Sequence, residues 1–166
     1  MLEPWERILT ISHDLETNAY LLKKALESLV EMFTVTGTSI DPDKCNLMHF
    51  SWRRHETNPP LRTTLYGKDI TITPPASICW LGFYLDRKLS FRHHVSLLAK
   101  KGRAIVSGLK VLGNTVAGIS PSNLHLLYKT VVIPAITYGS QLWFDPKKPN
   151  KMLIKQLEKV QHQALK

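Results

Sequence analysis

The second half of this sequence contains almost no acidic residues. Residues 87–166 carry fourteen Lys or Arg against only Asp145 and Glu158, a net charge of +12, whereas residues 1–86 carry eight against eleven, a net charge of −3. A one-sided surplus of this kind costs self-repulsion, and the usual compensation is a polyanionic partner, most often nucleic acid. A basic helical surface that is merely solvated is the plain alternative.

Long apolar runs and paired cysteines are missing as well. No run of eighteen uncharged apolar residues occurs, so we expect no membrane span, and the first residues lack the basic and apolar regions of a signal peptide. An intracellular protein is therefore the default expectation. Cys45 and Cys79 lie far apart in apolar, strand-like surroundings, which favours two buried thiols over a disulfide or a zinc site.

The spacing of apolar residues predicts a helix and then strands in the first half. A three-to-four residue period predicts a helix over 14–33, capped by Ser12 or Asp14 and stopped at Gly37. Leu47, His49 and Ser51 alternate with Met48, Phe50 and Trp52, which predicts a strand over 44–52 with one buried face. Two β-rich runs around Gly67-Lys68 predict a hairpin over 63–73.

The stretch Trp80–Val95 joins two different periods. Its dense apolar and aromatic run predicts one largely buried strand from Trp80 to Asp86. After Asp86 the apolar positions follow helical spacing, which predicts a helix from Ser90 to about Leu112. We expect the junction between these two elements to lie beside the ligand.

The remaining residues are predicted to be helical. Ser120-Pro121 predicts a helix start, and Pro134 is expected to kink or end that helix and leave a further turn or short helix up to Trp143. A last helix is predicted from Asn150 to the C-terminus, with a basic flank of Lys151, Lys155 and Lys159. Together the elements predict an α+β fold, in which a small antiparallel sheet with one packed helix is followed by a helical bundle.

Three strings in this order resemble the reverse transcriptase of non-LTR (LINE-type) retrotransposons. They are DPDKCNLMHF at 41–50, WLGFYLDRKLSF at 80–91 and LYKTVVIPAITYGSQLW at 127–143. Each string alone is weakly specific, but three in the right order, over most of the chain, make the resemblance specific.

The resemblance implies a C-terminal palm and thumb fragment of that polymerase. Residues 1–86 would be a partial palm ending in a primer-grip strand, and residues 87–166 would be a basic helical thumb and a following helix. The implied partner is an RNA–DNA hybrid or duplex, contacted through phosphate and sugar. The primer-grip-like residues would be Trp80, Leu81, Gly82 and Phe83. The basic candidates for nucleic-acid binding are Arg87, Lys88, Arg92, Lys100, Lys101, Arg103 and Lys110.

The sequence departs from the family pattern at the metal site. Polymerase chemistry uses two Mg²⁺ ions held by aspartates, and the family's Asp-Asp turn would fall just before residue 10, yet no adjacent Asp pair occurs in the sequence. The resemblance therefore implies a fragment without fingers or front palm, holding no cofactor and inactive as a polymerase alone. Lys44 matches a lysine near the incoming nucleotide in the family, a role that would be vestigial here; a solvated turn lysine is the simpler interpretation.

Other chemistry finds little support. His93 and His94 are adjacent, so they point to different helix faces and cannot both ligate one ion, and no zinc-type spacing occurs. The aromatic residues Trp80, Phe83, Tyr84, Tyr138 and Trp143 could stack on bases, although such dense apolar positions are more often core. The alternative function is a non-catalytic module, derived from such an element, that binds nucleic acid or protein.

Overall fold

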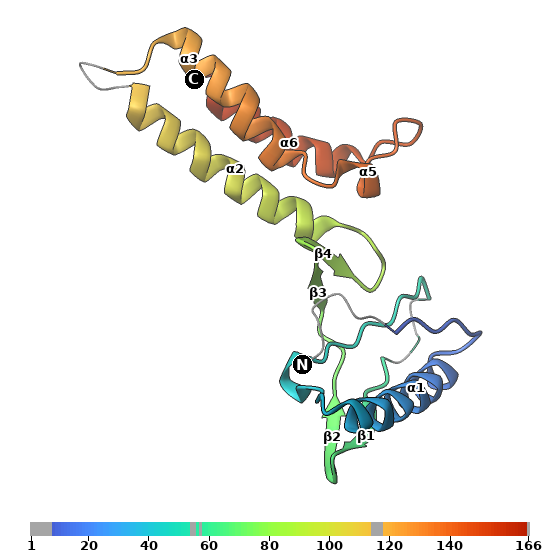
Figure 1. The fold of residues 1–166 in the computed structure, drawn as a ribbon. Coiled ribbons are helices and arrows are strands. Elements are labelled where there is room, and N and C mark those ends of the chain that lie inside the picture. Colours follow the sequence, from blue (N-terminus) through green and yellow to red (C-terminus); the bar gives the residue numbers. More distant parts are fainter. Residues whose placement is uncertain (1–7, 54–55, 57, 114–117, 166) are drawn as a thin grey trace. The chain divides into compact units, whose positions relative to one another are not determined.

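Two compact units make up the protein. The computed structural model describes residues 8–53, 56, 58–113 and 118–165, and the contacts divide the chain into Met1–Ile78 and Cys79–Lys166 (Figure 1). Two small antiparallel sheets and a series of helices account for the regular structure, which confirms the predicted mixture of α and β. The assignment of residues 1–86 and 87–166 to palm and thumb stays a prediction.

Helix α1 (Leu15–Thr36) forms where the apolar spacing predicts it. The carboxylate of Asp14 accepts a hydrogen bond from the backbone N–H of Thr17 at 2.6 Å, and this bond lowers the pKa of Asp14 from its ordinary value. Gly37 ends the helix with φ of 72°, a left-handed conformation in which its N–H reaches the last carbonyls. The predicted cap and stop are both confirmed.

A hairpin packs against α1. Strand β1 (Leu61–Leu65) pairs with β2 (Lys68–Ile72) in antiparallel register from Leu61 opposite Ile72 to Leu65 opposite Lys68. The turn is Tyr66-Gly67, one residue earlier than predicted, and both residues have positive φ. The core between helix and hairpin consists of Leu26, Ile40, Leu47, Leu61 and Leu65.

The segment after the 3₁₀ turn η1 (Pro42–Lys44) is not the strand that alternation predicts. Residues 45–53 run as irregular chain, and Leu47 and His49 are nevertheless buried. His49 Nε2 lies 3.0 Å from the carbonyl oxygen of Pro59. Because Pro59-Pro60 offers no backbone N–H, that neighbouring loop supplies no ladder for a strand. The predicted alternation is therefore seen in the burial of the side chains, but the predicted strand pairing is not.

The two cysteines differ in their surroundings. Cys45 is half-buried, and burial, followed by the nearby charge of Asp41, raises the pKa of its thiol. Cys79 is exposed, so the expectation of two buried thiols is wrong for this residue. Both thiols are free.

The predicted strand Trp80–Asp86 is instead a tight hairpin. Strand β3 (Ser77–Trp80) turns at Leu81-Gly82 and returns as β4 (Phe83–Asp86). Leu81 has φ of 49° and Gly82 has φ of 80°, the two positive values of a type I′ hairpin turn. Because leucine rarely adopts a positive φ, Leu81 gives no sign of a turn in the sequence, and the run is predicted as one uninterrupted strand.

Helix α2 (Arg92–Gly113) begins after a turn organised by one carboxylate. Asp86 accepts hydrogen bonds from the backbone N–H groups of Lys88, at 3.1 Å, and Ser90, at 2.8 Å, while its second oxygen accepts the Ser90 hydroxyl. The helix starts two residues after the predicted cap Ser90. This turn fixes the path of the chain from β4 into the basic helix.

A broken helical stretch follows α2. It consists of α3 (Pro121–Leu127), η2 (Tyr128–Val132) and α4 (Ile133–Ile136). In η2 the N–H of Ile133 bonds to the carbonyl of Tyr128, five residues back, and this wider turn comes just before Pro134, which has no N–H to donate. The helix runs on for two residues past Pro134 and ends at Ile136, so the break lies near the predicted position and a short helix up to Trp143 follows, as expected.

Two further helices complete the second unit. Helix α5 (Ser140–Trp143) is short, and α6 (Lys151–Ala164) is capped by the side chain of Asn150, which accepts from the Met152 N–H. Helix α6 runs alongside α2 (Figure 1). The core of this unit consists of Ala99, Val106, Val132, Ile136 and Val160.

Gly102 is the point of closest approach of α2 to its neighbours. A Cβ atom added there would stand 3.0 Å from Cγ1 of Val160 and still closer to Cγ2 of Ile136. The absence of a side chain at Gly102 therefore lets both α4 and α6 contact α2 directly. Gly108, further along α2, faces open space.

An aromatic junction holds the β3–β4 hairpin in the second unit. Tyr138, which follows α4, stacks on Phe83 with ring centroids 5.0 Å apart, and its hydroxyl donates to the carbonyl oxygen of Leu81 at 2.8 Å. His94 of α2 is 1% exposed and lies between Tyr84 and Tyr138. The Tyr84 N–H can only donate, so Nδ1 of His94 accepts it, at 3.5 Å, and Nε2 donates to the Tyr138 carbonyl, at 3.3 Å.

We predict opposite effects for two glycine substitutions in α2. Gly102→Ala should destabilise the protein by roughly 2 kcal/mol because the added methyl overpacks the contact with Ile136 and Val160. Gly108→Ala should stabilise it by about 0.5–1 kcal/mol because alanine favours a helix and meets nothing there. Thermal unfolding followed by circular dichroism measures both changes. Equal changes in stability in the two variants would contradict the close contact of Gly102 with Ile136 and Val160.

A second pair of glycines tests the aromatic junction. Gly82→Ala and Gly67→Ala both place a methyl group at positive φ, but only the Gly82 methyl meets a neighbour, the Tyr138 ring at 3.3 Å. We expect Gly82→Ala to cost roughly 1 kcal/mol more than Gly67→Ala, because Tyr138 is held on two sides. Hydrogen exchange in β4 and β2 measures the cost for each hairpin. The excess should vanish in a Tyr138→Ala background.

Candidate nucleic-acid interface

The predicted basic residues lie in the turn before α2 and along that helix. Lys88, Arg92, Lys100, Lys101 and Arg103 are exposed, while Arg87 and Lys110 are half-buried. The ion pairs Lys23–Glu27, Lys44–Asp41 and Arg53–Glu56 all lie in the first unit, and none of them involves a cation of α2. The exposed cations of α2 are therefore not neutralised by an acidic side chain of the residues described.

Helix geometry separates these cations into two directions. At about 100° per residue, Arg92, Arg103 and Lys110 fall within about 20° of one another around α2. Lys100 lies about 60° from Arg103, whereas Lys101 lies about 160° from it. The buried residues Val95 and Gly102 occupy the side that faces the core. One flank of α2 therefore presents a row of cations to solvent, and Lys101 stands apart from it.

Lys110 lies on the same flank as Arg92 and Arg103, although it is half-buried and they are exposed. From Arg92 to Lys110 the row extends along α2 for about 27 Å, at 1.5 Å per residue. Its charges are spaced two to three turns apart. Such a row suits a long polyanion rather than a small anionic ligand, because one small ligand could contact only one of these side chains.

The primer-grip-like residues lie in the hairpin that precedes α2. Trp80 is 39% exposed and Leu81 is 66% exposed, so the largely buried surface predicted for this run is wrong at the turn. Phe83 is half-buried under Tyr138, and Gly82 lies against the Tyr138 ring. The turn therefore exposes apolar side chains to solvent, while Tyr138 contacts its backbone from the other side.

The other aromatic candidates divide between core and surface. Tyr138 is 46% exposed, so one part of its ring is accessible while the other stacks on Phe83. Trp143 and Tyr84 are half-buried. In the described residues the indole N–H of Trp143 is buried without a hydrogen-bond acceptor. Among these residues Trp80 and Tyr138 have the accessible ring surface that stacking on a base needs.

Lys44 is singled out by the resemblance as a vestigial candidate. It lies in the first unit, is largely exposed, and its Nζ stands 3.4 Å from a carboxylate oxygen of Asp41 three residues earlier. This geometry agrees with a solvated turn lysine. An exposed pair of this kind contributes little to stability.

Six of the seven histidines lie among the described residues, and His55 lies outside them. Within the described residues no group of three or more His, Cys, Asp or Glu side chains is placed to hold a metal ion. His93 is exposed and His94 is buried, so the two point to different sides of α2 as expected. The role of His94 in the aromatic junction is not among the sequence predictions, which weigh it only as a candidate ligand. Its burial could have been predicted from its spacing, because His94 lies three residues after Phe91 and four before Leu98, on the apolar side of the helix.

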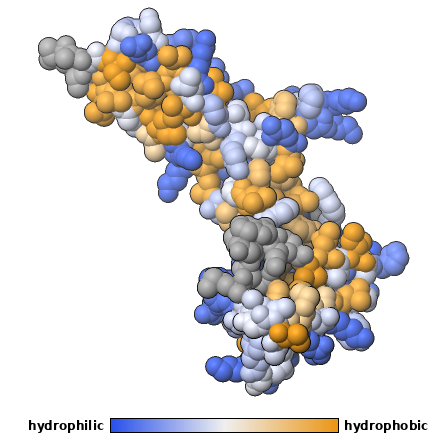
Figure 2. Space-filling model, viewed as in Figure 1, coloured by the Kyte–Doolittle hydropathy of each residue, from blue (hydrophilic) through white to orange (hydrophobic). Residues whose placement is uncertain are grey.

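The surface of the protein carries both hydrophilic and hydrophobic regions (Figure 2). Hydrophilic residues gather over the loop between α5 and α6, and a hydrophobic patch lies over the end of α2 and α3, where Val111, Leu112 and Leu126 are exposed. No helix in the described part of the chain combines the length and apolarity needed to cross a bilayer.

Comparison with known proteins gives two similar sequences. The chain is 32% identical over 104 residues to a protein of Drosophila melanogaster described as a probable RNA-directed DNA polymerase from transposon X-element. It is 30% identical over 84 residues to a retrovirus-related Pol polyprotein from the type-1 retrotransposable element R1 4 of Nasonia vitripennis. The aligned residues are 63% and 51% of this chain.

The same alignments cover only part of the relatives. The chain spans 11% of the first protein and 21% of the second. No protein-family model and no solved structure matches the chain. The resemblance to the reverse transcriptases of non-LTR retrotransposons is nevertheless confirmed, because over half of its length or more this chain is similar in sequence to proteins of two such elements.

Proposed function

We propose that this chain is a palm and thumb segment of a non-LTR retrotransposon reverse transcriptase that binds the template–primer duplex and does not polymerise by itself. The observation that carries the proposal is the row of unneutralised cations on α2. The names of the two relatives support it, because an RNA-directed DNA polymerase must hold an RNA–DNA hybrid.

The cations of α2 would bind the duplex through its phosphates. Arg92, Arg103 and Lys110 lie on one flank of a helix whose other side is fixed to α4 and α6 through Gly102. A rigid row of cations contacts phosphates without reading bases, so binding would be tolerant of sequence and strongly weakened by salt. A polymerase that copies any template needs this kind of contact.

The β3–β4 hairpin would hold the end of the primer strand. Its exposed turn, Trp80 to Gly82, lies at the start of the chain that leads into α2, and Tyr138 fixes the carbonyl of Leu81. Trp80 offers an accessible ring for stacking on a base or sugar. Because Asp86 fixes the turn into α2, the hairpin and the cation row would act on one duplex as a unit.

Polymerisation by this chain alone is not part of the proposal. The reaction requires two Mg²⁺ ions held by aspartates, and the sequence has no adjacent Asp pair. The described residues bring together no cluster of acidic side chains that fits such a pair of ions. We therefore assign to this chain the holding of the duplex and not the transfer of nucleotides.

A binding measurement tests the duplex contact. We expect the chain to bind a 20-base-pair RNA–DNA hybrid with an affinity that falls steeply between 50 and 200 mM salt, since counterions are released from the phosphates. The triple variant R92Q/K100Q/R103Q should weaken binding and flatten the salt dependence by roughly one unit of log–log slope for each phosphate that is no longer neutralised. Fluorescence anisotropy at several salt concentrations measures both quantities.

The matched control removes the same charge from the first unit. K24Q/R62Q/K68Q changes three exposed cations on α1 and the β1–β2 hairpin, and it should leave the affinity nearly unchanged. Equal weakening by both triple variants would mean that only net charge matters. Weak binding that salt does not alter would favour the protein-interaction module over the duplex-binding segment.

Primer extension tests the absence of catalysis. We expect no extended product when the chain is incubated with a primed RNA template, deoxynucleotides and Mg²⁺, because the described residues bring together no carboxylates that could hold the two ions. A complete reverse transcriptase in the same buffer provides the positive control. Extension that follows the template and persists in a second independent preparation of the chain would refute this part of the proposal.

A further inference from the structure

Helix α6 has two opposite faces. Leu153 is 1% exposed and Val160 is fully buried, and with Leu157 they face the core against α2 and α4. Lys151, Lys155 and Lys159 follow at intervals of four residues. At about 100° per residue these lysines centre on the side of the helix opposite Leu153 and Val160. The inner face is therefore already occupied, and the outer face carries a stripe of lysines.

The charges of this stripe are not balanced. All three lysines are exposed, and none of them forms an ion pair with the residues that the structure describes. Like charges four residues apart on one helix repel each other. The exposed lysines Lys147 and Lys148, in the loop before α6, extend the same positive region. The helix thus holds cations about 6 Å apart along its axis.

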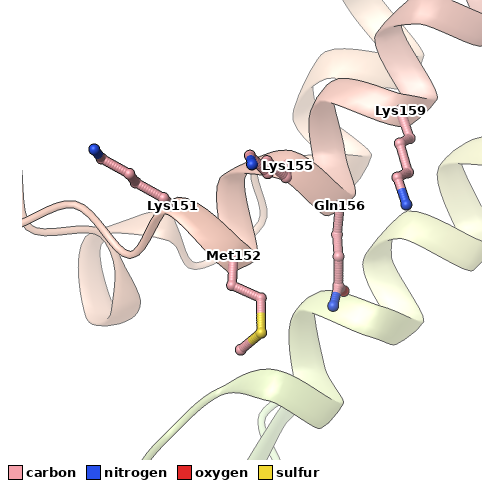
Figure 3. A pocket seen from close by; sticks show the side chains of 5 residues that line it. All are labelled: Lys151, Met152, Lys155, Gln156 and Lys159. Atoms are coloured by element: carbon pink, nitrogen blue, oxygen red, sulfur yellow. The ribbon is translucent and has the colours of Figure 1, made fainter.

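A shallow groove accompanies the stripe. It is lined by the three lysines together with Met152 and Gln156, all on α6, and has a volume of about 500 Å³ (Figure 3). In this view the side chains of Met152, Gln156 and Lys159 point to the same side of α6, while Lys151 points away from them. Cations, an amide and a thioether line the groove, and no carboxylate does.

We propose that the outer face of α6 is a second nucleic-acid contact, in which Lys151, Lys155 and Lys159 bind successive phosphates of a nucleic-acid backbone. This inference rests on one part of the proposed function, namely that the chain binds nucleic acid. The residues belong to a different helix from the cation row of α2. Lysine carries a compact charge and lacks the planar guanidinium with which arginine makes paired hydrogen bonds to a base. The contact therefore depends on the phosphates of the nucleic acid and not on its base sequence.

The structure favours nucleic acid over a lipid surface as the occupant of this stripe. A helix that binds a membrane places its apolar face in the lipid and its lysines at the headgroups. In α6 the apolar face is closed against α2, since Val160 is fully buried and Leu153 almost so. Met152, 45% exposed, is the large apolar side chain left in the groove. The stripe therefore offers charge without a surface for insertion.

The test compares two triple variants in the complete chain. K151Q/K155Q/K159Q removes the stripe, and R92Q/K100Q/R103Q removes the α2 cations; each is measured with a 20-base-pair RNA–DNA hybrid and with a 20-nucleotide single-stranded RNA. We expect the α6 variant to weaken binding roughly tenfold at 100 mM salt and to reduce the log–log salt slope by about two units. The comparison of hybrid and single strand shows which backbone the stripe holds.

Three controls separate binding from folding and from net charge. Circular dichroism and the melting temperature should be unchanged in the α6 variant, because its side chains lie outside the core. K151R/K155R/K159R keeps the charges and should bind like the parent chain. Glu158→Gln removes the one acidic residue of α6 and should strengthen binding; an unchanged affinity in this variant would count against the stripe.

The outcomes distinguish this inference from the proposed function. Weaker binding in the α2 variant with parent-like binding in the α6 variant would overturn the second contact and leave the proposed function standing. The reverse result would support the α6 stripe and remove α2 from the proposal. Binding that neither variant changes would overturn both. If the α6 variant no longer bound vesicles of anionic lipid but kept its affinity for RNA, the stripe would be a lipid surface and the inference would fail.

Discussion

The contact of Tyr138 with the turn Leu81-Gly82 determines how the second unit is put together. Its ring stacks on Phe83, its hydroxyl holds the Leu81 carbonyl, and its own carbonyl accepts from His94. Three segments that are far apart in the sequence therefore meet at one residue. Without this contact the hairpin would be joined to the rest of the unit only through β4, by the turn at Asp86 and the contacts of Phe83 and Tyr84 with His93 and His94 of α2. An isolated two-stranded hairpin is marginally stable in water.

The close packing at Gly102 explains why the cations of α2 lie away from the core-facing side of the helix. Gly102 lets α4 and α6 pack directly on α2, so this side of the helix is committed to the core, and the cations are left on the remaining surface. Packing thus fixes the direction in which Arg92 and Arg103 point. A flexible cluster of the same charges would lose side-chain and backbone freedom on meeting a duplex, whereas this row loses mainly the freedom of its side chains.

Sequence reasoning succeeded where the signal was local and failed where a partner was distant. The caps at Asp14 and Ser120 and the stop at Gly37 depend on neighbouring residues, and all three formed as predicted, while the last helix begins next to Asn150 as expected. The turn at Leu81-Gly82 instead depends on Tyr138, which lies more than fifty residues later. His94 is a different case, because its spacing on the apolar side of α2 indicates burial locally, whereas its two hydrogen-bond partners belong to other elements and have no local signal.

The charge asymmetry follows from this division of the helices into inner and outer faces. Both α2 and α6 bury their small and branched apolar residues against each other, so every additional cation must lie on the outside, where neither Asp86 nor Glu158 neutralises it. Repulsion among these cations opposes folding of the second unit and not of the first, which has a slight acidic excess. A polyanion on the outer faces would relieve that repulsion. Binding of such a polyanion would therefore be coupled to the folding of this unit through the same side chains.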